Sequence, residues 1–143
     1  MTEQELAQAC AEAMYARDLA SQALGITLEH VEPGAARLAM TVTDNMVNGH
    51  GICHGGYIFL LADSAFAFAC NTYNLMTVAQ SAAVEFVAPV YRGDELVATA
   101  NETTRFGRNG LYDIRVERDG GTVAVFHGRS RSLGRPVLEE DGK

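Results

Sequence analysis

The chain of 143 residues has no tryptophan, three prolines and three cysteines, and only 8% of it is aromatic. The cysteines, Cys10, Cys53 and Cys70, are odd in number and form no CxxC pair, which argues against a disulfide framework and favours a reducing compartment. Low-complexity tracts are absent too, so only the charged tail Glu139–Lys143 is expected to lack order. With 48% hydrophobic residues, the chain fits one domain over residues 1–143.

Basic residues are in the minority, since 11 Lys and Arg stand against 18 Asp and Glu for a net charge of −7. Nucleic-acid binders normally carry a basic face, so no nucleic-acid partner is expected. The acidic start Met1–Glu5 lacks the features of a signal peptide. The longest apolar stretch, Tyr57–Cys70, is interrupted by Asp63 and Ser64 and is too short to span a bilayer. We therefore expect a cytoplasmic protein without a membrane partner.

Hydrophobic periodicity divides the chain into helical and extended segments. Residues 3–24 follow helical spacing, with Thr2 and Glu5 resembling a capping box and Gly25 as the stop. From Ile26 the period changes to two, which predicts strands over residues 26–31, 37–43, 78–90, 95–105, 111–118 and 122–133. Tight turns between consecutive strands favour an antiparallel, mostly meander-like sheet.

The segment Gly55–Asn71 has almost no polar face. Its length and alanine content favour a helix over a buried strand, and a helix that is apolar all round is surrounded by protein. The expected fold is α+β: a curved antiparallel sheet of about six strands wrapped around one long buried helix, with a helix at the N-terminus. Because a single sheet leaves an edge strand exposed, and pairing of edges removes that liability, we expect a homo-oligomer.

Two features of the buried helix point to chemistry. Gly55 and Gly56 begin it, where the first N–H groups lack an internal partner, the helix dipole is positive, and glycine lets a ligand approach. An oxyanion hole for acyl transfer requires these properties. Asp63 lies inside the helix without a Lys or Arg there to pair with it, and an isolated buried acid is a functional candidate.

Helix geometry relates the two features. Gly55 and Asp63 are eight residues apart, which is about 12 Å along a helix axis, whereas oxyanion donors must lie about 3 Å from the developing charge. One helix therefore cannot bring both groups to the same carbonyl. If two such helices pack antiparallel, Gly55 of one subunit meets Asp63 of the other, and a two-fold dimer makes two sites.

The pattern Asn48-x(5)-His54-Gly55-Gly56-x(6)-Asp63 resembles the signature of the hot-dog fold thioesterases, specifically the phenylacetic-acid-degradation (hydroxyphenylacetyl-CoA thioesterase) branch. Further similar segments are Gln80–Phe86, the turn Pro89–Asp94, and Gly107–Gly110 before Tyr112 and Asp113. The resemblance covers roughly Asn48 through His127, and it is the combined pattern that is specific.

The resemblance implies an enzyme that hydrolyses aryl-acetyl-type (phenylacetyl or hydroxyphenylacetyl) or medium-chain acyl-CoA to a carboxylic acid and free CoA. The Gly55 N–H would polarise the thioester carbonyl, and Asp63 of the partner subunit would act as general base or nucleophile. Asn48 would position Asp63 or the attacking water, His54 would orient the thioester, and Ser81 would hold water.

The resemblance also implies which residues contact the substrate. These are Gly56 and the turn Gly107, Arg108, Asn109 and Gly110, which would lie near the pantetheine or nucleotide part of CoA. The family is usually a homotetramer, a dimer of dimers, and uses no metal or other cofactor.

Simpler interpretations stand beside these roles. Asn48 could be a turn residue, Ser81 an ordinary strand serine, and Arg108 a turn arginine in a solvated loop. The Cys53–His54 pair is not expected to form a nucleophile pair because adjacent side chains seldom face each other. With His50 it has the wrong spacing for a zinc box, and no fourth ligand is evident.

Two alternative functions remain on the same fold. An acyl-thioester dehydratase or hydratase would pair a His with a carboxylate, but His54 and Asp63 are nine residues apart, about half a turn out of phase on one helix. A non-catalytic acyl-CoA binding protein is the other alternative, and no DNA-reading element argues for a regulator.

Overall fold

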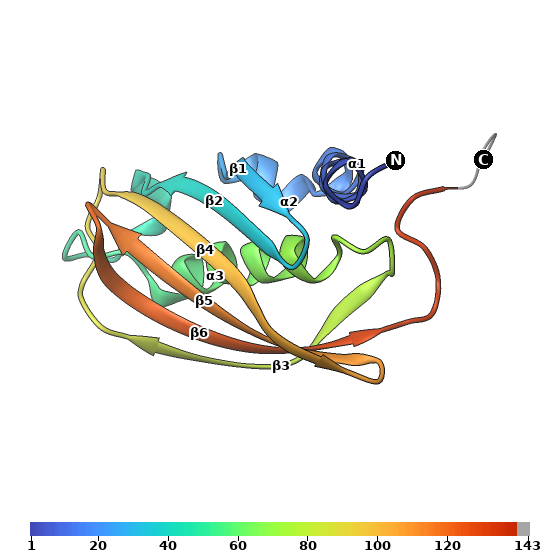
Figure 1. Cartoon of the computed structure of the whole chain (residues 1–143). Helices are drawn as coiled ribbons and strands as arrows, with labels where there is room; N and C mark the ends of the chain where they lie inside the picture. The colour runs from blue at the N-terminus through green and yellow to red at the C-terminus, as the bar shows by residue number, and fades with distance from the viewer. Residues whose placement is uncertain (140–143) are drawn as a thin grey trace.

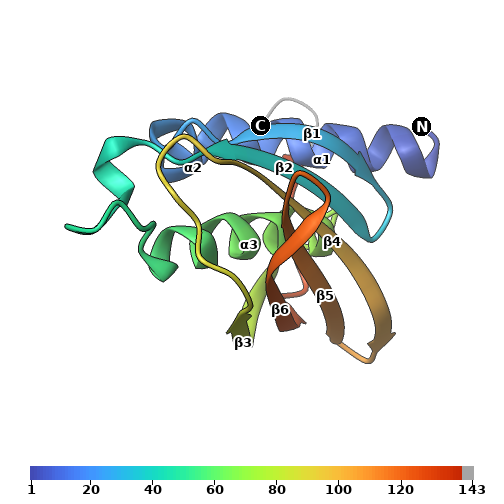
Figure 2. The ribbon, with the colours of Figure 1, turned by 90° about the vertical axis from the view of Figure 1, so that its left-hand side faces the viewer.

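The computed structural model describes residues 1–139. Residues 140–143, which make up most of the tail that is expected to lack order, lie outside the described residues. The elements in chain order are α1 (Glu3–Arg17), α2 (Leu19–Ala23), β1 (Thr27–Glu32), β2 (Ala35–Thr41), the short 3-10 helix η1 (Asp44–Met46), α3 (Gly55–Cys70), β3 (Thr77–Phe86), β4 (Glu95–Phe106), β5 (Asn109–Arg118) and β6 (Gly121–Ser132). The strands form one curved antiparallel sheet around α3, and α1 lies beside β1 (Figures 1 and 2). The predicted α+β architecture is confirmed.

The strand order is β1-β2-β4-β5-β6-β3. The prediction of a meander is right for β1–β2 and for β4–β5–β6, but it is wrong for β3, which lies at the far edge and pairs only with β6. The connection through α3 explains the difference. β2 and β3 run in the same direction, so α3 returns the chain along the strands, and it packs on the face of the curved sheet against every strand from β2 to β3, which lets the chain emerge at the far edge. As a result β2 pairs with β4.

The N-terminal segment forms two helices where the sequence predicts one. Asp18 interrupts it: its carboxylate accepts the Ser21 N–H at 3.0 Å and the Ser21 hydroxyl at 2.7 Å, so Asp18 caps α2. The predicted capping box is confirmed, because the Glu5 N–H donates to Thr2 Oγ1 at 3.0 Å and the Thr2 N–H to Glu5 Oε1 at 2.9 Å. Gly25, with φ of 71°, ends the helical region as predicted.

The strand predicted over residues 78–90 ends earlier, at Phe86. The N–H groups of Val87 and Ala88 both donate to the carbonyl of Val123, at 2.8 and 3.2 Å, so the chain leaves the regular ladder there. The irregular segment that follows runs past the start of α3, where the Cys53 N–H donates to Val90 O at 2.7 Å.

Most of α3 packs against the sheet, but one stripe of it does not. The Phe66 ring contacts Tyr112 and Phe126, with centroid distances of 5.5 and 5.9 Å, and a Cβ on Gly128 would lie 2.7 Å from that ring. Glycine at 128 therefore lets the helix lie close to β6. The stripe that faces away from the core contains residues that are only half-buried or exposed in the single chain, namely Gly56, Leu60, Asp63 and Ala67. The expectation of a helix enclosed on every side thus holds for only part of its surface.

No helix formed within residues 1–139 has both the length and the apolar character needed to cross a membrane.

Candidate functional site

The start of α3 has no side-chain cap. His54 is the N-cap residue, with φ −61° and ψ 135°, and its ring makes no capping hydrogen bond. The first turn also contains no acidic residue. A Cβ on Gly56 would meet nothing within 4 Å, so the space beside this turn is open. The first N–H groups, those of Gly55 and Gly56, are thus available as donors to an anion or a carbonyl oxygen.

The loop before α3 uses the Asn48 side chain. Asn48 Oδ1 accepts the N–H groups of His50 at 2.9 Å and of Ile52 at 3.1 Å, which closes the loop. The His54 N–H donates to Met46 O at 2.8 Å and anchors the end of the loop. Within one chain Asn48 therefore shapes the approach to Gly55, which supports its interpretation as a turn residue. Its contact with Asp63 or with water stays a prediction.

Asp63 lies near the middle of α3 and is half-buried. Burial raises the pKa of its carboxyl group, because desolvation disfavours the charged form. The ion pairs within residues 1–139 all join other residues. Cys70, two turns further along the helix, is 4% exposed, and burial, with a smaller effect from the Asp63 charge, raises the pKa of its thiol to about 12. The surroundings of Asp63 thus offer no compensating cation.

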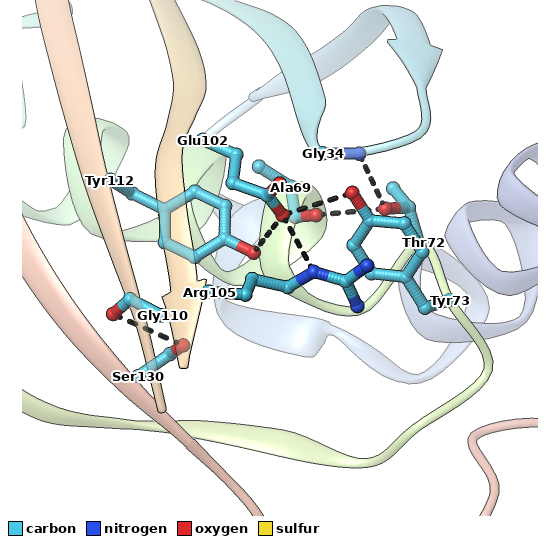
Figure 3. Close-up of polar contacts among 9 residues, drawn as sticks. All are labelled: Gly34, Ala69, Thr72, Tyr73, Glu102, Arg105, Gly110, Tyr112 and Ser130. Carbon is cyan, nitrogen blue, oxygen red and sulfur yellow. Dashed lines mark hydrogen bonds and ion pairs between the residues drawn. The ribbon is translucent and has the colours of Figure 1, made fainter. Parts of the chain in front are cut away.

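Glu102 is another half-buried acid, and unlike Asp63 it has hydrogen-bond donors and a cation beside it (Figure 3). Its Oε1 accepts hydrogen bonds from the hydroxyls of Tyr73 at 2.9 Å and Tyr112 at 3.1 Å, and it pairs with Arg105 Nε at 3.3 Å. The Arg105 guanidinium also lies 3.7 Å from the centroid of the Tyr73 ring. Burial, together with the hydrogen bond that the Tyr73 hydroxyl donates to Glu102, raises the pKa of Tyr73 to about 12. One oxygen of this carboxylate thus joins two tyrosines and an arginine, so Glu102 stabilises the fold near the end of α3.

The turn Gly107–Gly110 joins β4 to β5 at the other end of α3. Gly107 has φ of 58°, Arg108 is exposed, and Asn109 Oδ1 accepts from Arg129 Nε at 3.4 Å. Gly110 is buried.

A small cavity of about 50 Å³ lies between the Gly107 turn and the end of α3, with Cys70 and Tyr73 among its lining residues. Gly55 and Cys70 are fifteen residues apart in this helix, or about 22 Å along its axis. Within one chain, the predicted substrate-binding turn and the open start of α3 therefore lie at opposite ends of the helix.

Ser81 lies on the outer face of the sheet, because it is paired in register with the exposed Arg129 of β6. It lines a shallow groove of about 480 Å³ that also contains Asp113 and His127. His127 Nδ1 and Asp113 Oδ1 are 2.6 Å apart. The pairing directs Ser81 away from the face that covers α3, and its role in holding water stays a prediction.

The sequence analysis assigned no role to Phe86, which contacts the helix start. A Cβ on Gly55 would lie 2.7 Å from Phe86 Cζ, so the tip of the ring reaches the Gly55 backbone. In the sequence Phe86 appears only as the last residue of Gln80–Phe86, a segment that resembles the family. Alternation along a strand does not reveal what its last residue contacts. Within the described part of the chain, no group of three or more His, Cys, Asp and Glu residues is arranged to hold a metal ion.

Comparisons with known proteins point to one family. The family described as "Thioesterase superfamily" matches residues 50–125. The acyl-coenzyme A thioesterase PaaI of Escherichia coli is 44% identical over 131 residues, which is 91% of this chain and 94% of that protein. The solved structure of the E. coli PaaI protein from the phenylacetic acid degradation operon superposes with a TM-score of 0.92 and 41% identity, over 94% of this chain and 99% of that one.

A mutant of the phenylacetic acid degradation protein PaaI from Thermus thermophilus is a more distant match. It superposes with a TM-score of 0.76 and 36% identity, over 79% of this chain and 97% of that one. The curved sheet around α3 is therefore the hot-dog fold that the sequence pattern predicts.

Proposed function

The chain belongs to the thioesterase superfamily, and from this premise we propose that it hydrolyses acyl-CoA to a carboxylic acid and free CoA, with aryl-acetyl-type (phenylacetyl or hydroxyphenylacetyl) or medium-chain acyl groups. One observation carries the residue assignment: α3 combines an uncapped start at Gly55 with an unpaired, half-buried acid at Asp63. An acyl-transfer site needs both an oxyanion donor and a base.

We infer that the two groups meet across a dimer interface. They are eight residues apart in α3, about 12 Å along its axis, so one helix cannot supply both to one carbonyl. The stripe of α3 that the sheet leaves uncovered contains Asp63 together with the small residues Gly56 and Ala67. Small residues let two helices approach closely. In an antiparallel pair, each Gly55 then lies beside Asp63 of the partner subunit.

Strand β3 supports this geometry. It pairs only with β6, and most of its residues are exposed although several are apolar, with Val78 at 43% exposure. A free apolar edge of this kind is normally covered. Pairing of two β3 strands in a two-fold dimer would extend the sheet and bring the two α3 helices side by side. A dimer of such dimers would give a homotetramer.

The proposed reaction uses these groups in sequence. The Gly55 N–H donates to the thioester carbonyl oxygen and stabilises the oxyanion as it forms. Asp63 of the partner subunit accepts a proton from water as the water oxygen bonds to the carbonyl carbon. The intermediate then collapses, the C–S bond breaks, and the departing CoA thiolate takes the proton from Asp63, which restores the carboxylate. If Asp63 attacks directly, a mixed anhydride forms in the first step, and water hydrolyses it in the second.

The remaining predicted residues fit around this centre. His54 caps the helix beside Gly55 and would orient the thioester, Gly56 adds a second free N–H, and Ser81 would hold water. The partner's Cys70 lies seven residues beyond Asp63, so the end of the partner helix extends about 10 Å past Gly55 in the antiparallel pair.

The partner's turn Gly107–Gly110, which adjoins that helix end, would therefore bind CoA beyond the thioester. Its Arg108 supplies a cation for phosphate. Within one chain His54 and Asp63 are about half a turn out of phase on α3, and the match to thioesterases favours hydrolysis over the dehydratase alternative.

Replacing Asp63 tests the base. Asp63→Asn and Asp63→Ala should each lower kcat for phenylacetyl-CoA hydrolysis by about 10²–10⁴-fold, because a positioned base contributes that much. Asp63→Asn should keep substrate binding, since its amide fills the same space. Release of free thiol and isothermal titration with the substrate measure the two effects. Undiminished turnover in either variant would rule out the assignment.

Replacing Gly55 tests the oxyanion donor. Gly55→Pro removes the N–H at the first helical position, where proline is well tolerated, while the control Gly55→Ala keeps it. Both variants bring a Cβ toward Phe86, so their difference isolates the N–H. We expect kcat of Gly55→Pro to be about 10²–10³-fold below that of Gly55→Ala. Equal kcat values for the two folded variants would contradict the role.

The pH dependence tests the protonation state of Asp63. The carboxylate must be ionised to accept a proton, and burial raises its pKa. Activity should therefore fall as the pH decreases through that raised pKa, so the acid limb of kcat/KM should have its midpoint above the ordinary aspartate value of about 3.9. Profiles of initial rate against pH measure the midpoint. A midpoint at or below the ordinary value would contradict this expectation, because it would mean that the partner's helix start outweighs the desolvation of the carboxylate.

A further inference from the structure

The contact between Phe86 and Gly55 brings an aromatic ring to the proposed oxyanion donor. A Cβ on Gly55 would lie 2.7, 3.0 and 3.2 Å from three atoms of the ring. The ring is nevertheless 54% exposed, and the next residue, Val87, is 59% exposed. A large apolar side chain that touches a reaction centre and remains open to solvent has surface for a ligand to cover.

A groove of about 400 Å³ begins at this contact. It runs from Gly55 and Ile58 along the segment that follows β3, and its other lining residues include Ile52, Phe86 and Pro89. None of the side chains along it is charged at neutral pH, and burial raises the pKa of the only titratable one, the Cys53 thiol. Its volume suits a small organic group.

The chemistry of the groove selects one arm of the thioester. The pantetheine arm contains amides that need hydrogen-bond partners, and the nucleotide contains phosphates that need cations. The groove offers no polar side chain other than the thiol, and the N–H groups of Val87 and Ala88 already donate to Val123. A hydrocarbon acyl group needs no such partners and gains by leaving water.

We propose that Phe86 is the specificity-determining residue for the acyl group. Its ring and the adjoining groove hold the apolar body of a bulky acyl chain, aryl-acetyl or medium-chain, while the carbonyl oxygen stays at Gly55. An aromatic acyl group gains further from ring-to-ring contact. The inference rests on the proposed thioesterase function and assigns the acyl side of that same site. Acetyl-CoA, whose methyl group is too short to cover the ring, gains little from Phe86.

The test compares wild type with Phe86→Ala and Phe86→Leu on phenylacetyl-CoA, hexanoyl-CoA and acetyl-CoA. For Phe86→Ala we expect kcat/KM to fall about 10- to 100-fold with the two larger substrates, in the range that a hydrophobic pocket discriminates, and less than about threefold with acetyl-CoA. Phe86→Leu should keep most activity on hexanoyl-CoA and lose more on phenylacetyl-CoA, because it keeps apolar surface and loses the ring.

Leu19→Ala in α2 is the matched control, since Leu19 is an apolar side chain with 73% exposure and does not line the groove. It should leave all three rates unchanged. An equal loss on all three substrates in folded Phe86 variants, with or without a change of oligomeric state, overturns the inference and assigns Phe86 to structure or to an interface. If Phe86→Ala does not fold, the Phe86→Leu ratios decide. Absence of hydrolysis of every acyl-CoA by wild type would instead refute the proposed function itself.

Discussion

The proposed site depends on the interaction between a desolvated carboxylate and the start of a neighbouring helix. In the single chain each has an unmet requirement: Asp63 has a raised pKa and no cation beside it, and α3 begins without a side-chain cap. An anion at a helix N-terminus is stabilised by about 0.3–1 kcal/mol, and by up to about 2 kcal/mol where partly buried. Association of two antiparallel copies would therefore offset both deficits. It would also leave the carboxylate reactive, because N–H donors do not neutralise it as an arginine would.

The rest of the fold sets up this association. Crossing from β2 through α3 places β3 at the far edge of the sheet, where its outer side is unpaired. The same crossing leaves the Asp63 stripe of α3 uncovered. At the other end of the helix, the Glu102 carboxylate accepts hydrogen bonds from two tyrosines and pairs with an arginine (Figure 3). The polar cluster that stabilises the fold and the acid proposed for catalysis thus lie at different places along α3.

The sequence predicted the elements whose signal is local. The length and alanine content of an apolar segment located α3, and the lone acid within it identified Asp63 as a candidate without any structural information. The position of β3 could not be predicted, because it depends on how far α3 carries the chain across the sheet. The contact of Phe86 with Gly55 depends on the same crossing and on the bend after β3. For Asn48 the sequence left two interpretations open, a turn residue or a site residue. In the structure its side-chain oxygen accepts hydrogen bonds within the loop, as the first interpretation predicts.

Whether the site is shared between subunits can be measured directly by complementation. Two inactive proteins, Asp63→Asn and Gly55→Pro, are unfolded together in equal amounts and allowed to reassociate. Random pairing makes half of the dimers mixed, and each mixed dimer has one intact site, so about a quarter of the wild-type activity should return. If both groups acted within one chain, no mixed dimer would contain an intact site. Activity no higher than that of either variant alone, in a mixture shown to contain mixed dimers, would contradict the account.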